Sequence, residues 1–343
     1  MRKKAYSLVL VIVIILILLI FSSVSLFQSI SEKNLTQRYK ESLQAFWIAE
    51  AGINKALQEL RNDFNWTGEE GNLEDGSYEI TVNVIDSKTR EVLSSGYIPS
   101  KTNYRTKRTL KAIMSKFIPS GFYDYTVYCA GDVDINGNSF SIVNNQPSPD
   151  DKALIYSEEY DVEHPENITG QIEQDESISP LARLDFQQLY NIASSQGNVY
   201  DETRLQEVKN GNDSFPSSFW YSEGVPNVVY VTTDLELNGN IGTIGGFFVV
   251  AGDIITDPDD TDDIVINGNG QIDGVIYTRG QFRINGGGGG LNVDGGVWAQ
   301  EVRINGNAHL AYNADYMSAI ENLGIEASVQ ITAWRDLNNP YQF

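Results

Sequence analysis

The sequence has one cysteine, Cys129, and two histidines among its 343 residues. A single cysteine cannot form an internal disulfide, so the fold must be stable without one. Cys129 lies in the apolar stretch Val127-Tyr128-Cys129-Ala130, which predicts a buried packing residue. The histidines, His164 and His309, are far apart in the sequence, and no nucleophile, base and orienting group can be assembled around them. We therefore expect no enzymatic activity and no cofactor.

Proline is absent before Pro99, and no charged residue lies between Lys4 and Glu32. Within this part of the chain, residues 8–21 form an unbroken apolar run that continues through small and apolar residues to Phe27. A run of this length suits a helix that crosses a bilayer core of roughly 30 Å. The alternative is a secretory signal peptide, whose apolar core is shorter and ends at a small-residue cleavage site. The length of the run favours a transmembrane helix to about residue 27.

The helical pattern continues beyond the apolar run. Apolar residues recur at the spacing of an amphipathic helix, so one long helix is predicted over residues 6–62. Its predicted packing stripe consists of Leu35, Tyr39, Leu43, Phe46, Ile53, Leu57 and Leu60. Apolar and polar residues then alternate along strand-like segments, as at Tyr78, Ile80 and Val82. We expect residues 63–120 to form a small antiparallel sheet that covers the helix stripe.

Two segments of this region resemble a known family. The start, Lys4-Ala5-Tyr6-Ser7-Leu8-Val9, looks like the processing site of type IV prepilins, where a short basic leader ends at a small residue before an aliphatic run. Residues 44–57, QAFWIAEAGINKAL, are similar to the AFYAAEAGIxxAL signature of PilX-type minor pilins. The resemblance covers the first 120 residues well and the rest loosely. It implies that residues 1–5 are a leader and that a prepilin peptidase cuts between Ala5 and Tyr6.

Two residues depart from the family pattern. Ala5 stands where prepilins usually have Gly, and Leu10 stands at the fifth mature position, where major pilins carry a Glu that is thought to pair with a neighbouring amino terminus. An apolar Leu cannot neutralise a buried ammonium, so Leu10 favours a minor or tip subunit. The resemblance implies other pilins and minor pilins as partners. It also implies a single pass through the inner membrane with a cytoplasmic N-terminus, followed by an extracellular filament or cell-surface location.

Negative charge is concentrated in the distal part of the chain. The formal net charge is −22; residues 1–117 contain 16 basic and 12 acidic residues, and the remainder contains 8 and 34. The acidic region repels phosphate backbones, which argues against nucleic acid as a partner. The preceding basic residues could hold DNA or anionic lipid, but alternating residues of one strand would place them on a solvated face, which we favour. These residues are Lys101, Arg105, Lys107, Arg108 and Lys111.

A short element recurs after residue 120, in which two apolar residues flank a polar one and Asn-Gly follows. The last three Asn-Gly pairs are 18 and 20 residues apart, a spacing typical of a solenoid. We expect a right-handed parallel β-helix-like solenoid over residues 121–312, in an α+β chain. The predicted corner residues are Asn136, Gly137, Asn238, Gly239, Asn267, Gly268, Asn285, Gly286, Asn305 and Gly306. Asn-Gly hairpins are the alternative, but the irregular downstream sides favour the solenoid.

Two further segments complete the predicted organisation. Residues 145–227, acidic and interrupted by prolines, are predicted to be a partly helical insertion in the solenoid, and residues 313–343 a C-terminal cap over its last coil. Aromatic residues gather near the end of the insertion at Phe215, Phe219, Trp220 and Tyr221. Such a cluster could stack on sugar rings, but packing against the solenoid is the commoner use.

An acidic loop provides the one metal candidate. Asp257, Asp259, Thr261 and Asp263 place oxygen ligands at alternate positions, which suits Ca²⁺. The glycine and the closing glutamate of an EF-hand loop are missing, because Asp262 and Gly268 stand at those positions. We therefore favour a solvated acidic loop over a calcium site.

Taken together, these patterns predict a minor pilin that joins a type IV pilus-like filament by its N-terminal helix. The acidic solenoid would be displayed for contact with a cell surface, a particle or a partner. The alternative is a membrane-anchored, extracellular β-helix protein that binds or degrades polysaccharide. A self-polymerising, bactofilin-like solenoid is disfavoured by the predicted insertion and cap.

Overall fold

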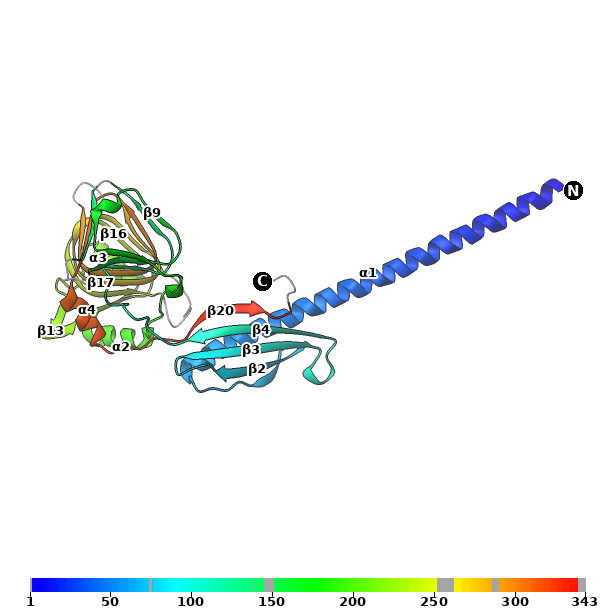
Figure 1. The fold of residues 1–343 in the computed structure, drawn as a ribbon, viewed down its shortest axis with the longest axis horizontal. Coiled ribbons are helices and arrows are strands. Elements are labelled where there is room, and N and C mark those ends of the chain that lie inside the picture. Colours follow the sequence, from blue (N-terminus) through cyan, green and yellow to red (C-terminus); the bar gives the residue numbers. More distant parts are fainter. Residues whose placement is uncertain are drawn as a thin grey trace. The chain divides into compact units, whose positions relative to one another are not determined.

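The computed structural model describes residues 2–73, 76–137, 139–144, 151–251, 262–285 and 290–338, with side chains of the first helix from residue 16 on, residue 17 excepted. The chain divides into two compact units. The first, here called the helix–sheet unit, comprises Met1–Ser115 and Ile331–Phe343. The second, called the parallel-sheet unit, comprises Lys116–Gln330. Figure 1 shows both units, coloured along the sequence.

The helix–sheet unit combines one long helix with an antiparallel sheet (Figure 1). Strand β2 pairs with β1 and β3, β3 pairs with β4, and β20 from the far end of the sequence lies next to β4. The strands β2, β3 and β4 lie within residues 63–120, where the sequence predicts a small antiparallel sheet. The elements are α1 (Arg2–Asn62), β1 (Glu70–Leu73), β2 (Gly76–Val84), β3 (Thr89–Ile98), the 3-10 helix η1 (Lys101–Asn103), β4 (Thr106–Ser115) and β20 (Gln330–Asp336).

The C-terminal third of α1 packs on this sheet mainly through small residues. Ala45, Ala49 and Ala56 are fully buried, and Leu60 is buried beside them. Gly52 of α1 and Gly96 of β3 allow the close approach. A Cβ on Gly96 of β3 would lie 2.9 Å from the backbone nitrogen of Ala49, and closer still to the carbonyl oxygen of Ala45. The helix backbone therefore rests almost directly on β3.

In its described residues, the parallel-sheet unit contains a 13-stranded sheet, three α-helices, two short 3-10 helices and one small hairpin. Its elements are β5 (Val127–Cys129), β6 (Val133–Asn136), β7 (Phe140–Val143), β8 (Lys152–Tyr156), β9 (Tyr160–Val162), η2 (Pro165–Asn167), β10 (Ile168–Thr169), β11 (Gln171–Gln174), η3 (Glu176–Ile178), α2 (Phe186–Gln196), β12 (Val199–Tyr200), α3 (Glu202–Lys209), β13 (Trp220–Ser222), β14 (Val225–Pro226), β15 (Val228–Val231), β16 (Leu235–Val250), β17 (Ile264–Asn285), β18 (Leu291–Asn305), β19 (Ala308–Tyr312) and α4 (Ala314–Glu321).

The long strands of this unit pair in parallel, and the repeated sequence elements are level with one another. Residues 235–240 of β16 pair with residues 264–269 of β17, so that Asn238 is opposite Asn267. Farther along, residues 281–285 of β17 pair with residues 301–305 of β18. The alternative of Asn-Gly hairpins is therefore wrong, because a hairpin would make these neighbours antiparallel.

The sheet has an apolar core on each of its faces. Alternate residues of β17, such as Ile264, Ile266 and Ile284, belong to an interior cluster together with their counterparts on neighbouring strands. Val275 and Tyr277 belong to a second cluster, which includes Phe186 and other residues of α2 and α4. The helices thus cover one stretch of the outer face. The stretch of β17 from Val275 to Tyr277 is buried on both of its faces, which explains why its residues are all apolar.

Strand order departs from sequence order at several places. Strand β18 pairs with β17 on one side and with β5 and β6 on the other, and β19 pairs with β7. Residues 145–227, predicted as an insertion, contribute β8, β9 and β10 to the same sheet through parallel pairs with β5, β6 and β7. The range predicted as a cap is divided, because α4 belongs to the parallel-sheet unit and residues 331–343 to the helix–sheet unit.

The predicted fold class included a transmembrane helix, and the predicted location was a single-pass membrane anchor. Both predictions were wrong. No helix in the described residues is long and apolar enough to cross a membrane, which overturns the single-pass inner-membrane anchor. Ser22, Ser23 and Ser25 interrupt the apolar residues of the part described. The side chains of residues 8–15 lie outside the described residues.

The predicted right-handed solenoid of short strands is also corrected. The structure has one 13-stranded, predominantly parallel sheet, whose strands β16, β17 and β18 are 16, 22 and 15 residues long. The physical reason is that backbone pairing continues through the Asn-Gly positions instead of stopping there, since Asn238 and Gly239 pair with Asn267 and Gly268.

Replacing Gly96 by Ala tests the close approach of α1 to β3. The added methyl group has to push the helix off the strand, and we expect a loss of about 1–3 kcal/mol, the usual cost of overpacking a core. Native-state hydrogen exchange of the β2, β3 and β4 amides would measure the loss. The control is Ala51→Ser, at an exposed position of the same helix. Equal exchange rates in the two variants would contradict the packing described.

Candidate functional site

The first candidate site is an apolar surface on α1 that no described residue covers. Leu19 is 65% exposed, Phe27 72% and Leu35 63%. We call this the exposed helix surface; its residues are Leu16, Leu18, Leu19, Ile20, Phe21, Val24, Leu26, Phe27, Ile30, Leu35, Tyr39 and Leu43. Large apolar side chains exposed in this number indicate an interaction site.

The predicted helix stripe is divided between this surface and the sheet. Ile53, Leu57 and Leu60 are buried, and Phe46 is partly buried. Leu35, Tyr39 and Leu43 remain exposed. The predicted stripe omits Ala45, Ala49 and Gly52, the residues that contact the sheet most closely. Small side chains give no signal in the hydrophobic periodicity. The motif AxxxAxxG in residues 45–52 would have been the clue.

A buried carboxylate lies where the exposed part of α1 meets the covered part. Glu41 is only 3% exposed. Its Oε1 pairs with the Arg105 guanidinium at 2.8 Å and accepts a hydrogen bond from Gln37 Nε2 at 2.7 Å. The Glu41 charge is thus compensated inside the chain, as a buried carboxylate requires.

The remaining residues of the basic cluster, Lys101, Lys107, Arg108 and Lys111, also have partners. Lys101 pairs with Glu70 at 2.5 Å and with Glu79 at 2.9 Å. Arg108 pairs with Asp336, and Lys111 with Glu91. Lys107 Nζ lies 5.2 Å from the centre of the Tyr97 ring. Hydrogen bonds from Tyr97 and Lys101 lower the pKa of Glu79, so these cations are engaged by groups of the same unit.

The second candidate site begins with a ladder of asparagine side chains in the parallel-sheet unit. Asn267 Nδ2 donates to Asn238 Oδ1 at 3.0 Å, and Asn285 Nδ2 donates to Asn267 Oδ1 at 2.8 Å. Asn305 Nδ2 lies 3.5 Å from Asn285 Oδ1, a longer contact. We call these four residues the asparagine ladder. All its amides point the same way, so Asn238 is the end at which an N–H donor is left over.

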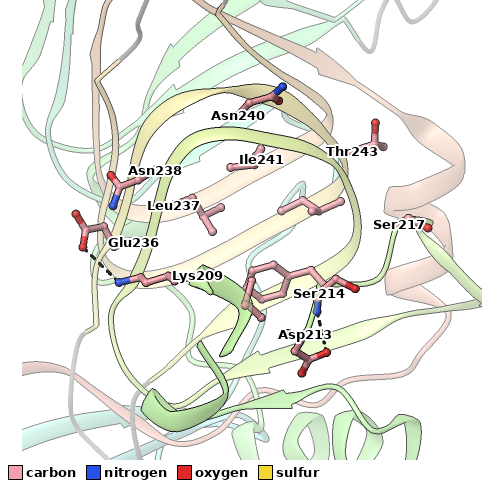
Figure 2. Close-up of a pocket in the computed structure, with 13 residues that line it drawn as sticks. Lys209, Asp213, Ser214, Ser217, Glu236, Leu237, Asn238, Asn240, Ile241 and Thr243 are labelled. Carbon is pink, nitrogen blue, oxygen red and sulfur yellow. Dashed lines mark hydrogen bonds and ion pairs between the residues drawn. The ribbon is translucent and has the colours of Figure 1, made fainter. Parts of the chain in front are cut away.

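A pocket of about 400 Å³ lies at this end of the ladder. Figure 2 shows Leu237 and Ile241 pointing into the space that the ribbon encloses, while Glu236 and Asn238 point away from it. Phe215 and Ile244 complete the apolar part of the wall. The other lining residues are Val208, Lys209, Asp213, Ser214, Ser217, Asn240 and Thr243.

The rim of the pocket carries charges of both signs. Lys209 Nζ lies 3.6 Å from Glu236 Oε2, and both side chains are about half exposed (Figure 2). On the opposite side, hydrogen bonds from Arg204 Nε and then from the Ser214 backbone lower the pKa of Asp213. Asp213 is therefore ionised and already paired with Arg204.

The other predicted residues are placed as follows. Asn238, Gly239, Asn267 and Gly268 lie inside long strands, whereas Asn136, Asn285 and Asn305 are the last residues of β6, β17 and β18. Gly137 and Gly306 follow two of those ends, and their backbones are in close contact, because a Cβ on Gly137 would lie 2.8 Å from the Gly306 carbonyl oxygen. Gly286 lies outside the described residues, as do the side chains of Ala5 and Tyr6.

The metal candidate lies mostly outside the described residues, and the aromatic cluster is divided between buried and exposed side chains. Asp257, Asp259 and Thr261 lie outside the described residues. Asp263 Oδ1 accepts a hydrogen bond from the Gln281 backbone at 2.6 Å, and the described residues contain no group of three metal-type side chains. Phe215 and Phe219 are buried, the latter stacked on Tyr316. Trp220 and Tyr221 are more exposed.

Comparison with known proteins gives a match among solved structures but none among families. No family model and no curated protein matches the sequence. Among solved structures, the competence-associated pilin ComZ from Thermus thermophilus matches with a TM-score of 0.21 and 11% sequence identity. The match covers 86% of this chain and 97% of that chain. A TM-score of this size carries no argument, and the PilX-type resemblance is not confirmed.

Removing one rung tests what the asparagine ladder contributes. Asn285 makes two ladder contacts and Asn305 only the 3.5 Å one. We expect Asn285→Ala to lose about 1–2 kcal/mol of stability, and Asn305→Ala clearly less, because hydrogen bonds are worth about 1 kcal/mol each.

Cys129 provides the measurement. It is fully buried in the parallel-sheet unit, and burial raises the pKa of its thiol to about 12. Alkylation of Cys129 across a urea series therefore reports unfolding of this unit. Equal midpoints for the two variants would show that the ladder does not stabilise the sheet.

Proposed function

We propose that this protein is a pilin-type subunit, in the role of a minor pilin, that joins a type IV pilus-like filament through its N-terminal helix. The exposed helix surface would pack against the helices of other pilins and minor pilins. The parallel-sheet unit would be the displayed part, in contact with a cell surface, a particle or a partner protein. The proposal includes no catalytic reaction and no cofactor.

The observation that carries the proposal is the exposed helix surface. Every backbone group in the middle of a helix is already hydrogen-bonded, so α1 can offer a partner only its side chains. Those side chains are apolar, and the sequence has no charge between Lys4 and Glu32. A second apolar helix is the partner that buries such a surface without leaving polar groups unpaired.

The distribution of charge supports separate roles for the two parts of the chain, association for the helix and display for the acidic part. The residues after 117 carry 34 acidic and 8 basic side chains, whereas those of the exposed helix surface are uncharged. Mutual repulsion keeps acidic units apart and soluble, while the helices associate. The strongly acidic part also fits a cationic or neutral contact better than an anionic one.

Maturation is part of the proposal. The leader, residues 1–5, would be removed by a prepilin peptidase between Ala5 and Tyr6. The N-terminal sequence of the mature protein from cells with and without the peptidase would test this step separately from assembly. A start at Tyr6 only in the presence of the peptidase is the expected result.

Placing a carboxylate on the exposed helix surface tests the assembly role. In Phe27→Asp, the helix can join others only by burying an unpaired charge, which costs several kcal/mol. We expect this variant to be lost from the sheared filament fraction of producing cells, at an unchanged total amount of protein. Immunoblotting of the two fractions measures both quantities.

Gln58→Asp is the matched control. Gln58 is exposed on the same helix, but it lies in the part of α1 that packs on the sheet and outside the exposed helix surface. This variant should enter filaments as the unaltered protein does. The assembly role fails if Phe27→Asp is recovered in filaments to the same extent as Gln58→Asp, or if the unaltered protein is absent from them.

A further inference from the structure

Strand β16 has a partner along nearly its whole length on one side, interrupted only at Ile241 and Gly242, and along only a few residues on the other. On one side it pairs with β17 from Leu235 to Val250. On the other side β15 pairs with residues 247–250 alone. Within the described part of the chain, no strand pairs with residues 235–244 on that side. We call residues 235–244 the open edge.

The open edge offers backbone donors and acceptors to a partner. In a parallel strand, the N–H and C=O of alternate residues point to the same neighbour. The Leu235 N–H donates to the Asp263 carbonyl, on the side of β17. Glu236 and Asn238 therefore present their backbone groups to the other side, and both residues are exposed. Proteins usually cover or charge such an edge, because it readily accepts another strand.

The pocket lies against the same residues. Seven of its lining residues, from Glu236 to Ile244, belong to the open edge. Leu237, Ile241 and Ile244 supply apolar walls, with Phe215 on the other side. A strand added here would point alternate side chains into this space, as each strand of the sheet does into the interior cluster.

The asparagine ladder continues to the same edge. Asn238 Oδ1 already accepts from Asn267, and among the described residues no acceptor binds Asn238 Nδ2. An asparagine in the next strand would accept from it with the geometry of the rungs already present. Strand β17, which pairs with β16 on the side away from the open edge, shows the sequence that such an added strand requires. Its residues Ile264-Val265-Ile266-Asn267-Gly268-Asn269 pair with β16 residue for residue.

We propose that the open edge binds an extended segment of a partner protein that adds in parallel to β16. The segment would have the pattern apolar-x-apolar-Asn-Gly. Its backbone would pair with Glu236 and Asn238, its apolar side chains would enter the pocket, and its asparagine would extend the ladder. A sugar fits less well, because Phe215, the aromatic residue of the pocket, is only 6% exposed and offers no ring face for stacking.

The test uses the purified full chain and a fluorescein-labelled synthetic peptide with the sequence of residues 264–271, IVINGNGQ. Fluorescence anisotropy should show saturable binding. Two further peptides carry N-methyl groups on one or the other set of alternate residues. Methylation of one set should abolish binding and that of the other should leave it unchanged, because only one set faces β16.

Asn238→Ala and Asn305→Ala separate the ladder end from the rest of the ladder. Asn238→Ala should weaken peptide binding by about fivefold, the loss expected for one hydrogen bond. Asn305→Ala should leave it unchanged, since Asn305 lies at the far end of the ladder. Alkylation of Cys129 in urea verifies that both variants are folded.

Three results would overturn the proposal. The first is no saturable binding of the peptide. The second is an equal effect of the two methylation sets, which would mean that the peptide binds without strand pairing. The third is binding of chitotetraose that depends on Asn238 while the peptide does not bind, which would make the pocket a sugar site. The filament assay of Phe27→Asp does not depend on any of these results.

Discussion

Register between neighbouring strands is the constraint on which the parallel-sheet unit depends. Because side chains alternate along a strand, a shift by one residue would move Ile264 and Ile266 out of the interior cluster and into solvent. The same shift would separate the amides of Asn238 and Asn267. The apolar interior and the polar ladder therefore specify one alignment together, and the glycine after each asparagine permits it, since a Cβ on Gly268 would lie 2.9 Å from the Gly239 carbonyl carbon.

The regular parts of this arrangement could be predicted from the sequence. The spacing of the Asn-Gly pairs indicates parallel alignment of equivalent residues, and β16, β17 and β18 have it. The corners could not be placed, because the local pattern does not reveal that backbone pairing continues through Asn238 and Gly239. The pocket could not be predicted either, since α3 and β16 are brought together only by the fold.

For α1, sequence analysis predicted the helix but not the residues that make its closest contacts. Hydrophobic periodicity selects large residues, and of those selected, Leu35, Tyr39 and Leu43 are exposed. The contact with β3 depends on Ala45, Ala49 and Gly96. These residues are small enough for the backbones of the helix and the strand to approach each other closely. The pairing of β20 with β4 was missed for another reason. Strand β4 is more than 200 residues earlier in the chain, and such a pairing leaves no local pattern.

The position of β18 between β17 and β5 bears on the way the chain acquires its structure during synthesis. Val127 pairs with Val297, 170 residues farther along. When β5, β6 and β7 leave the ribosome, the strands that will cover one of their edges do not yet exist. One edge of these early strands stays unpaired until β18 and β19 have been synthesised and lie between them and β17. Long-range pairing of this kind slows folding and exposes edges to aggregation, so the edge of β5, β6 and β7 is open to other chains until β18 and β19 have been synthesised.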